Sequence, residues 1–372
     1  MKILYFLNGS NVSTAGGMEY HLVDITNWLE KKGVEVAIAV RKGTYIQKHL
    51  LQGKSNVIPL TWTGVKKIYA FYQAAKAIVK FSPDIISINR ERDIKRIYYI
   101  AKIAGIFLRH KPKLVAIFQN IGWRESFDLS RLDGLIFLNN YTKEHYLSWN
   151  KKAENKARIF NYGISMPHVD TLKKFNPGRE RRYFQGIGFP LIGMVGEFRK
   201  NQSELIDVAY ELKTKVPHFT IAFVGKGSEQ EIRPLKEKID RLGLKKNFLF
   251  SGNVDHSKIP DVFYDLDISV TTNRAEAFGL VFIESLASYT PLVAYASGGP
   301  VEILEKGGGF LVSGGPAEMA EKLYLLISDY TLRKSTGLAG RQAAEKYFSI
   351  DAMGNNHYAF YSNLLMERQR SS

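Results

Sequence analysis

Two glutamates, Glu276 and Glu284, enclose a stretch of the chain whose residue types could bind a phosphate and a sugar. A buried strand is predicted just upstream at 267–272, and helical apolar spacing follows at 280–287. We therefore expect a helix to begin near Gly279, where the chain has just left a strand. The free backbone N–H groups of its first turn, with the positive end of the helix dipole, would bind a phosphate.

The spacing of the two carboxylates fits a nucleoside diphosphate-sugar. They lie eight residues apart, which is about two helical turns at roughly 3.6 residues per turn. Glu276 would then stand before the helix and Glu284 inside it. Helix N–H groups would bind the diphosphate, one carboxylate the sugar hydroxyls and the other the ribose. A capped helix with two solvated glutamates has the same spacing, so the rest of the chain has to decide between the two interpretations.

Two adjacent cations follow another predicted strand. The apolar run 192–196 leads into Glu197-Phe198-Arg199-Lys200. Arg199 and Lys200 at the carboxyl end of a strand could neutralise a diphosphate and stabilise it as a leaving group. A solvated surface pair is the alternative. The glycine-containing turns at 224–227 and 297–300 mark two more strand ends at the edge where ligands of α/β proteins bind.

The first loop of the chain, residues 10–19, contains the pair Gly16-Gly17 and opens a helix. Paired glycines there would let the backbone approach a ligand closely. The loop lacks G-x-G-x-x-G, and the second strand ends at Val40-Arg41 without an acidic residue. A dinucleotide oxidoreductase is therefore disfavoured, whereas a tight turn without a ligand fits equally.

Strands and helices that could position these loops alternate along the chain. The predicted strands are 3–7, 34–40, 84–88, 114–118 and 135–138, then 191–195, 220–224, 248–250, 268–271 and 292–295. Helices are predicted near 66–80 and 93–108, from Tyr141 onward, and over 351–370. Regularity lapses between about 160 and 188, where prolines and a charged run indicate a connection. We predict an α/β protein with two doubly wound, Rossmann-like domains.

The predicted boundaries follow from that lapse. Residues 1–165 would form the first domain, 166–188 a linker, 189–350 the second domain and 351–372 a C-terminal helix. A chain of 372 residues is long enough for two domains.

Composition excludes several kinds of chemistry. The chain has no cysteine, so disulfides, thiolate metal sites and a cysteine nucleophile are ruled out. Its eight histidines form no pair or cluster with metal-ligand spacing, and we predict no metal site. Asp265 and Asp267 resemble a metal-binding pair, but they fall at a predicted helix end and a buried strand start. No apolar run approaches the roughly 20 residues of a membrane-spanning helix, and we expect a cytoplasmic protein.

The positive charge is concentrated in the first half. The whole chain carries +16, and residues 1–170 hold 26 Lys and Arg against 13 Asp and Glu, a net of +13. Such an excess predicts an anionic partner, and the basic amphipathic helix over 94–109 favours an anionic membrane surface, the cytoplasmic face of the inner membrane. Nucleic acid is disfavoured because aromatic and basic residues do not interleave on one surface. A basic half that serves only solubility is the plain alternative.

Taken together, the loops resemble a known family. The chain is similar to the retaining glycosyltransferases of family four, which have the GT-B fold, of the bacterial polysaccharide and lipopolysaccharide type. The resemblance is strong over about 190–310 and weaker over about 1–165. The motifs that carry it are Gly16-Gly17-x-Glu19, Arg199-Lys200-Asn201, Val224-Gly-x-Gly227, Ser251-Gly-Asn-Val254, Glu276-x-Phe-Gly279 with Glu284, and Ser297-Gly-Gly299.

The resemblance implies the architecture and a role for each motif. The two domains would face each other across a cleft, with the C-terminal helix crossing back to the first domain. Glu276 would contact the transferred sugar, Glu284 the ribose, and Arg199 with Lys200 the diphosphate. The remaining donor contacts would be Gly17, Val254, Phe278, Gly279, Leu280 and Val281. The donor would be a UDP- or GDP-linked sugar, with no further cofactor.

Two positions depart from the family pattern. Where such enzymes often carry a histidine, this chain has Gln119-Asn120. An amide can hydrogen-bond a sugar or acceptor hydroxyl, but it is no general base near neutral pH. Glu197 stands where an arginine is usual. The resemblance implies retaining hexose transfer to a glycan or lipid-linked acceptor. An epimerase or phosphorylase of the same fold, and a basic nucleic-acid-binding protein, are the alternatives.

Overall fold

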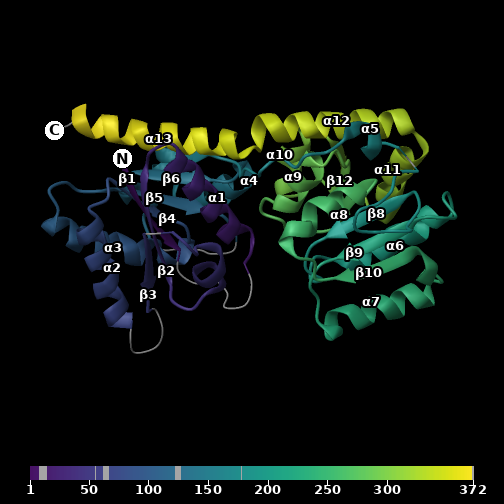
Figure 1. The fold of residues 1–372 in the computed structure, drawn as a ribbon, viewed down its shortest axis with the longest axis horizontal. Helices are drawn as coiled ribbons and strands as arrows, with labels where there is room; N and C mark the ends of the chain where they lie inside the picture. The colour runs from purple at the N-terminus through teal and green to yellow at the C-terminus, as the bar shows by residue number, and fades with distance from the viewer. Residues whose placement is uncertain (8–14, 55, 62–66, 122–126, 177, 371–372) are drawn as a thin grey trace. The chain divides into compact units, whose positions relative to one another are not determined.

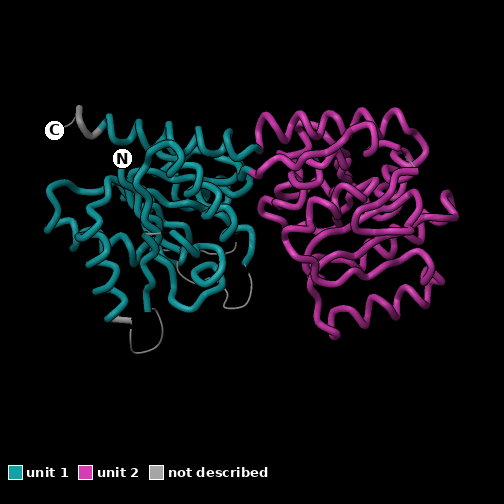
Figure 2. Tube along the Cα trace, in the orientation of Figure 1, with its two compact units in different colours: residues 1–163, 349–372 teal, residues 164–348 magenta. Residues whose placement is uncertain are grey.

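The computed structural model describes residues 1–7, 15–54, 56–61, 67–121, 127–176 and 178–370. The chain divides into two compact units, coloured separately in Figure 2: Met1–Gly163 with Ser349–Ser372, and Ile164–Phe348. Each unit contains a parallel sheet between helices (Figure 1). The predicted α/β class with two doubly wound, Rossmann-like domains is confirmed.

Seven parallel strands form the sheet of the first unit, in the order β3-β2-β1-β4-β5-β6-β7. In this sheet β2 and β3 lie on one side of β1, and β4 to β7 lie on the other. Ligands are therefore expected beyond the carboxyl ends of β1 and β4, where the strand order reverses. The strands are β1 (Lys2–Leu7), β2 (Glu35–Arg41), β3 (Val57–Leu60), β4 (Ile85–Ile88), β5 (Lys113–Phe118), β6 (Gly134–Phe137) and β7 (Ala157–Ile159).

Alternate residues of β1 enter two different apolar cores. Leu4 and Phe6 pack beneath α2 and α3, whereas Ile3 and Tyr5 pack beneath α1 and α13. Side chains of a strand point to opposite faces in turn, so a strand buried on both faces is apolar throughout. The helices are α1 (Gly17–Lys31), α2 (Lys67–Phe81), α3 (Ile94–Ala104), α4 (Asn140–Leu147) and α13 (Ile350–Arg370), and a 3-10 turn at Gly105–Phe107 follows α3.

The C-terminal helix α13 belongs to the first unit. The Trp28 indole N–H of α1 donates to the carboxylate of Asp351 at 2.7 Å. A side chain at Gly354 would overlap the Trp28 ring, so glycine permits the close approach of α13 to α1. Tyr361 is fully buried, and its hydroxyl lies 3.5 Å from that of Tyr5. The last helix of the sequence therefore completes the core around the first strand.

The second unit has six parallel strands in the order β10-β9-β8-β11-β12-β13. They are β8 (Leu191–Val195), β9 (Thr220–Val224), β10 (Phe248–Gly252), β11 (Ile268–Thr271), β12 (Leu292–Tyr295) and β13 (Gly309–Val312). The helices are α5 (Thr171–Lys174), α6 (Gln202–Lys213), α7 (Glu229–Arg241), α8 (Ile259–Asp265), α9 (Leu280–Ala287), α10 (Gly299–Leu304), α11 (Pro316–Ser328) and α12 (Tyr330–Tyr347).

Charged residues fasten the segment 166–188 to the second unit. The ammonium group of Lys174 is buried and donates to the carbonyl oxygens of Tyr264 and Leu266 at 2.8 and 2.6 Å, and to the Thr290 hydroxyl at 2.8 Å. Burial lowers the pKa of Lys174 well below its usual value. The segment that composition marks as a linker is therefore held along much of its length.

Asp265 and Asp267 face this segment. The carboxylate of Asp265 accepts the backbone N–H groups of Arg182, Tyr183 and Phe184 at 2.6 to 2.8 Å. Asp267 forms ion pairs with Arg179 at 2.8 Å and with Arg181 at 2.9 Å. Both carboxylates therefore attach residues 179–184 to the second unit. Within the described ranges, no three His, Cys, Asp or Glu side chains could jointly hold a metal ion.

We expect Lys174→Met to lower the free energy of unfolding by about 3 kcal/mol, because several buried oxygens would lose their donor. Lys173→Met is the matched control, since the neighbouring side chain is 77% exposed, and it should change stability by no more than about 0.5 kcal/mol. Urea unfolding of both variants measures the difference. Equal stability of the two variants would contradict the structural role of Lys174.

Candidate functional site

A glycine turns the chain into α9 at the carboxyl edge of the second sheet. Gly279 precedes the helix with φ +89°, and a side chain at this position would overlap the ring of Phe282. No side chain caps the helix. The N–H groups of Leu280 and Val281 in its first turn meet no acceptor among the residues that the structure describes. The helix thus begins where the sequence predicts it, with two backbone donors available to an anion.

The loop before α9 rests on a pair of glycines. The N–H of Gly299 donates to the carbonyl oxygen of Glu276 at 2.8 Å. A side chain at Gly298 would overlap that same oxygen, and one at Gly299 would overlap the carbonyl of Phe278. The hydroxyl of Ser297 donates to the Arg274 carbonyl at 2.6 Å. The Ser297-Gly-Gly299 motif therefore positions the Glu276 loop by close backbone contact.

Glu276 and Lys200 meet across two neighbouring strand ends. Lys200 Nζ donates to Glu276 Oε2 at 2.7 Å, and the Asn273 amide donates to the same oxygen at 3.2 Å. Both charged side chains are partly exposed. Because β8 and β11 are adjacent in the sheet, loops far apart in the sequence bring together two of the three predicted catalytic residues, which are Glu276, Lys200 and Arg199.

The Lys200 loop is itself fixed to the end of β11. Asn201 adopts a left-handed conformation with φ +63°. Its carbonyl oxygen accepts the Thr272 hydroxyl at 2.6 Å, and its amide donates to the Thr272 carbonyl at 3.2 Å. This reciprocal pair of hydrogen bonds sets the distance between the two loops and so supports the ion pair.

Arg199 lies apart from that ion pair. Its guanidinium contacts the carboxylate of Glu197 at 2.5 Å and is 74% exposed. Arg199 and Lys200 are neighbours in sequence, but their side chains have different partners. The predicted role of Arg199 on a diphosphate would require its guanidinium to leave Glu197 or to be shared with it.

Glu284 lies in the second turn of α9. Its side chain is 19% exposed and makes no hydrogen bond within the described part of the chain. Burial raises the pKa of its carboxyl group to about 7. The His256 imidazole lies 3.8 Å from the Glu284 carboxylate, and burial lowers the pKa of His256, which favours the neutral ring. Glu284 is therefore a carboxyl group held without compensation in a poorly hydrated place, which is typical of functional sites.

The other predicted donor contacts lie around α9. Val254 and Val281 both pack against one apolar cluster of the second unit, which contains Val262 and Phe263. Phe278 is buried, with its ring centroid 6.2 Å from that of Phe348. Val254 and Val281 thus share one apolar neighbourhood, although sequence separates them by a strand and a helix.

In the first unit, Gly17 is the first residue of α1, and the N–H of Gly16 donates to Glu19 Oε2 at 2.9 Å. The residues 8–14 of the same predicted loop lie outside the described residues. Gly17 therefore occupies a helix start at the carboxyl end of β1, where a backbone donor could reach a ligand.

Gln119 and Asn120 follow β5 at the same edge of that sheet. Both N–H groups donate to one oxygen of Glu91, at 2.8 and 3.2 Å. The Gln119 side chain is 4% exposed, and neither its amide oxygen nor its amide nitrogen has a hydrogen-bond partner in the described ranges. Burial raises the pKa of Glu91. A buried amide without partners is costly, and it could be satisfied by a ligand hydroxyl.

Sequence reasoning missed two residues that support these loops. Glu91 follows β4 at the carboxyl edge of the first sheet. An acidic residue just after a predicted strand could have indicated it from the sequence. In the second unit, Glu204 accepts the Tyr295 hydroxyl at 2.6 Å and Arg274 Nη2 at 2.9 Å. Arg274 also lies 3.4 Å from the Tyr295 ring centroid, and no local pattern in the sequence indicates this network.

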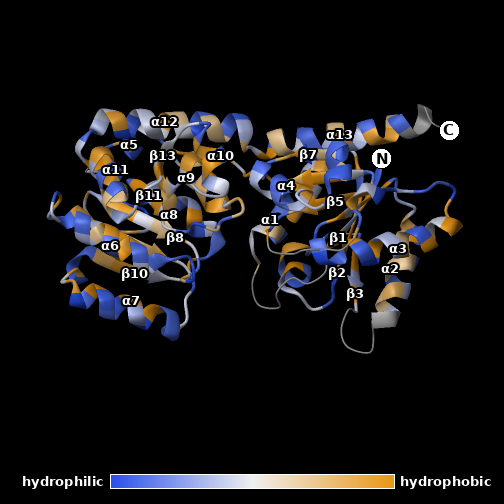
Figure 3. Cartoon of the chain, turned by 180° about the vertical axis from the view of Figure 1, so that it is seen from behind, coloured by the Kyte–Doolittle hydropathy of each residue, from blue (hydrophilic) through white to orange (hydrophobic). Residues whose placement is uncertain are grey.

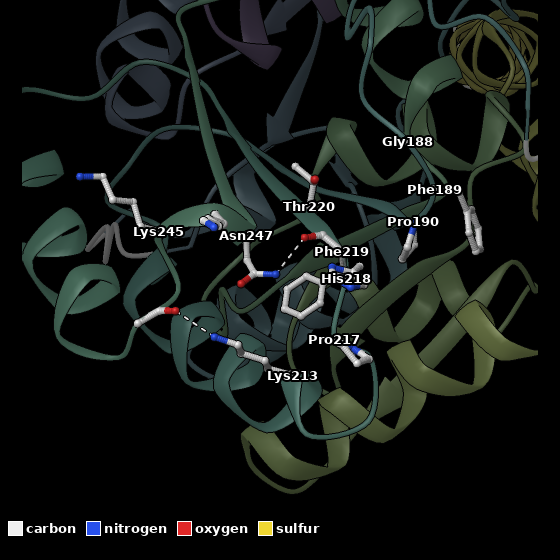
Figure 4. Close-up of a pocket in the computed structure, with 12 residues that line it drawn as sticks. Gly188, Phe189, Pro190, Lys213, Pro217, His218, Phe219, Thr220, Lys245 and Asn247 are labelled. Carbon is white, nitrogen blue, oxygen red and sulfur yellow. Dashed lines mark hydrogen bonds between the residues drawn. The ribbon is translucent and has the colours of Figure 1, made fainter.

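A cavity of about 610 Å³ opens at the other edge of the second sheet (Figure 4). It is lined by residues that precede β8, β9 and β10, among them Pro190, Phe219 and Asn247. Asn247 donates to the Phe219 carbonyl at 3.0 Å and Lys213 to the Gly243 carbonyl at 2.9 Å. Ligands of doubly wound sheets bind at the carboxyl edge, so this cavity is not the predicted site.

The geometry agrees with a comparison to known families. Residues 185–343 match the family model of glycosyl transferases group 1. The match lies within the second unit, which is therefore similar to group 1 glycosyltransferases. The chain is 29% identical over 206 residues to the sulfoquinovosyl transferase SQD2 of Arabidopsis thaliana, covering 52% of this chain and 38% of that protein. It is 31% identical over 173 residues to the putative glycosyltransferase EpsD of Bacillus subtilis, covering 45% and 44%. The chain thus spans less than half the length of these two relatives.

Longer matches are more distant. A D-inositol 3-phosphate glycosyltransferase of Corynebacterium jeikeium is 24% identical over 394 residues, covering 94% of this chain and 92% of that protein. A glycosyltransferase structure from Rickettsia africae superposes with a TM-score of 0.79 at 22% identity, covering 98% of both chains. Anabaena HepE in complex with UDP gives 0.79 at 20% identity, covering 98% and 100%. These structures confirm the GT-B fold of the chain.

The raised pKa of Glu284 predicts a pH-dependent effect on stability. Ionising Glu284 costs more free energy in the folded than in the unfolded chain. The stability that depends on its protonated form is therefore complete below pH about 4.5 and is lost as pH rises to about 7. We expect Glu284→Gln to stabilise the second unit by about 3 kcal/mol at pH 8, from about 1.4 kcal/mol per unit of pKa. The gain should vanish near pH 4. Urea unfolding of variant and wild type at both values measures it, and a gain independent of pH would refute the assignment.

Proposed function

We propose that the chain is a retaining glycosyltransferase that moves a hexose from a nucleoside diphosphate-sugar to a glycan or lipid-linked acceptor in cell-surface polysaccharide synthesis. The observation that carries the proposal is the Lys200–Glu276 ion pair of 2.7 Å beside the open N-terminus of α9. Both lie in the domain that matches group 1 glycosyltransferases. The HepE structures with UDP and UDP-glucose support a uridine diphosphate donor.

We assign the donor contacts by chemistry. The N–H groups of Leu280 and Val281 would bind the diphosphate, with Lys200 supplying a full positive charge. Glu284 would accept the ribose hydroxyls, and Val254 would flank the base. Glu276 would accept hydroxyl groups of the transferred sugar. The raised pKa of Glu284 supports its assignment, because two hydroxyl donors would provide the compensation that the folded chain lacks.

Transfer would then proceed on one face of the sugar. The acceptor oxygen attacks the anomeric carbon, the bond from that carbon to the phosphate oxygen breaks, and the acceptor proton passes to the departing phosphate. Lys200 and the helix N–H groups would stabilise the charge that develops on the leaving diphosphate. Arg199 would join them if its guanidinium turns from Glu197. No residue of this scheme has to form a covalent intermediate.

The acceptor is assigned to the first unit. The buried amide of Gln119 offers an NH2 group as donor and a carbonyl oxygen as acceptor, a combination that suits a hydroxyl group. Glu91 would hold the backbone of Gln119 and Asn120 in place. An amide is no general base, which agrees with a mechanism in which the leaving phosphate takes the proton. Turnover of a nucleotide-sugar without any acceptor would instead favour an epimerase of the same fold.

Two substitutions should separate transfer from donor binding. We expect Glu276→Gln to reduce transfer at least roughly a hundredfold, because it alters a contact at the reacting sugar. UDP affinity should stay equal or rise, because Lys200 loses its ion-pair partner. Glu284→Gln should weaken UDP binding by about 1–3 kcal/mol. Calorimetric UDP titration and a radiolabelled transfer assay measure the two effects. Lys245→Gln, in the cavity at the other sheet edge, is the control for a general loss of positive charge. Wild-type transfer by Glu276→Gln would exclude the proposed site.

We also propose that transfer needs no metal ion, because Lys200 and the helix N-terminus supply the positive charge at the diphosphate. Activity should therefore persist in excess EDTA, measured as the initial transfer rate against an untreated sample. Loss of the rate in EDTA and its recovery with Mn²⁺ or Mg²⁺ would contradict this assignment.

A further inference from the structure

Large apolar side chains are exposed mainly on one part of the first unit. Of sixteen such side chains in the described part of the protein, eight lie between residues 69 and 107. We call this set the α2–α3 surface. It consists of Tyr69, Phe71, Tyr72 and Val79 of α2, Tyr99 and Ile103 of α3, and Ile106 and Phe107 of the following turn. Such clustering on one pair of helices indicates an interaction surface.

Helix α3 is apolar on two sides. Ile97, Ile100 and Ala104 are buried beneath it in the core of the unit. Tyr99 and Ile103 lie four residues apart on the opposite side, and the exposed turn with Ile106 and Phe107 continues their row. A helix at the surface of a soluble protein normally has one apolar stripe and one polar face. The second stripe of α3 therefore needs a partner of its own.

Helix α2 extends this apolar surface. It packs against α3 and against the turn that follows α3, and the rings of Tyr69 and Tyr72 stack with centroids 6.3 Å apart. Figure 3 shows hydrophobic stretches beside hydrophilic ones along both helices. The most exposed residues are Ile106 at 77% and Phe107 at 73%, at the end of the surface.

Positive charge dominates among these side chains, although Arg96 is paired with Asp93 at 3.2 Å. Residues 67–81 and 94–111 contain eight Lys and Arg and no Asp or Glu. Contrary to the sequence-based expectation, basic and aromatic side chains do interleave on this surface: Lys76 Nζ lies 6.0 Å from the Tyr72 centroid, and Lys102 Nζ lies 5.3 Å from that of Tyr98. Two copies of this surface would bring like charges together, so charge complementarity favours an anionic partner over self-association.

We propose that the α2–α3 surface inserts into the interfacial region of an anionic lipid bilayer. Ile103, Ile106 and Phe107 enter the boundary between headgroups and acyl chains, the tyrosines lie at headgroup level, and the lysines and arginines bind anionic headgroups. The protein lies on the membrane and does not cross it: across the described chain, no helix is long and apolar enough to span a bilayer. The proposal is independent of the proposed transfer reaction.

Apolar insertion distinguishes this binding from simple attraction of charge. Electrostatic attraction is screened within about 8 Å at 0.15 M salt and within about 3 Å at 1 M. Burial of apolar side chains does not weaken as salt rises. Anionic vesicles should therefore capture the protein at low salt and retain a measurable part of it at high salt.

Vesicle sedimentation tests the proposal with the full chain. Wild-type protein should sediment with phosphatidylcholine vesicles that contain phosphatidylglycerol, and more weakly with phosphatidylcholine alone. The double variant Ile106→Ser, Phe107→Ser should bind at least roughly tenfold more weakly at both salt concentrations. Replacing Lys95, Lys102 and Arg109 with Gln should remove the preference for anionic vesicles and leave the salt-resistant part.

Leu172→Ser is the matched control, because Leu172 is 87% exposed but lies in the second unit. It should leave vesicle binding unchanged, and thermal melting should confirm that every variant folds. Undiminished binding by the double variant, or no binding of the wild type to either vesicle, would overturn the proposal. So would a wild-type dimer in light scattering that becomes monomeric in the double variant, since a second copy would then cover the surface.

Discussion

Close backbone contact between two loops determines the candidate site of the second unit. Gly298 and Gly299 have no side chains, so the loop that carries Glu276 lies directly against them. A methyl group at either position would displace the carbonyl groups of Glu276 or Phe278 and, with them, the start of α9. The ion pair with Lys200 and the open N–H groups of α9 depend on that placement. These glycines therefore position the candidate site through backbone contact.

At the carboxyl edges of the two sheets, several polar groups lack hydrogen-bond partners within the part of the chain that the structure describes. Glu284 has an uncompensated carboxyl group, and the first turn of α9 has no cap. In the first unit the buried amide of Gln119 has no partner among the described residues. The buried charges of Lys174 and Asp267, by contrast, each have several partners. Glu284, the first turn of α9 and Gln119 therefore remain available to a ligand that could complete their hydrogen bonds.

The sequence predicted the central strands because they are buried on both faces and read as continuous apolar runs. Three edge strands escaped prediction. β3 contains Pro59, β7 is only three residues long, and β13 begins at Gly309, so each lacks the length or composition of a central strand. The start of α9 after Gly279 was also predicted correctly. Like the central strands, it depends on residues that are close together in the sequence.

Side-chain partners were beyond that local information. Sequence put Arg199 and Lys200 into one role, yet Lys200 meets Glu276 whereas Arg199 meets Glu197. Which way each side chain points depends on Asn201 and Thr272, whose contact joins two loops 71 residues apart. The meaning of net charge also depends on contacts that the sequence does not show. In the second unit, two buried arginines form ion pairs with Asp267. Helices α2 and α3, in contrast, contain no Asp or Glu. An excess of charge therefore predicts a partner only where the fold leaves it on a surface, and in this chain that surface is also apolar.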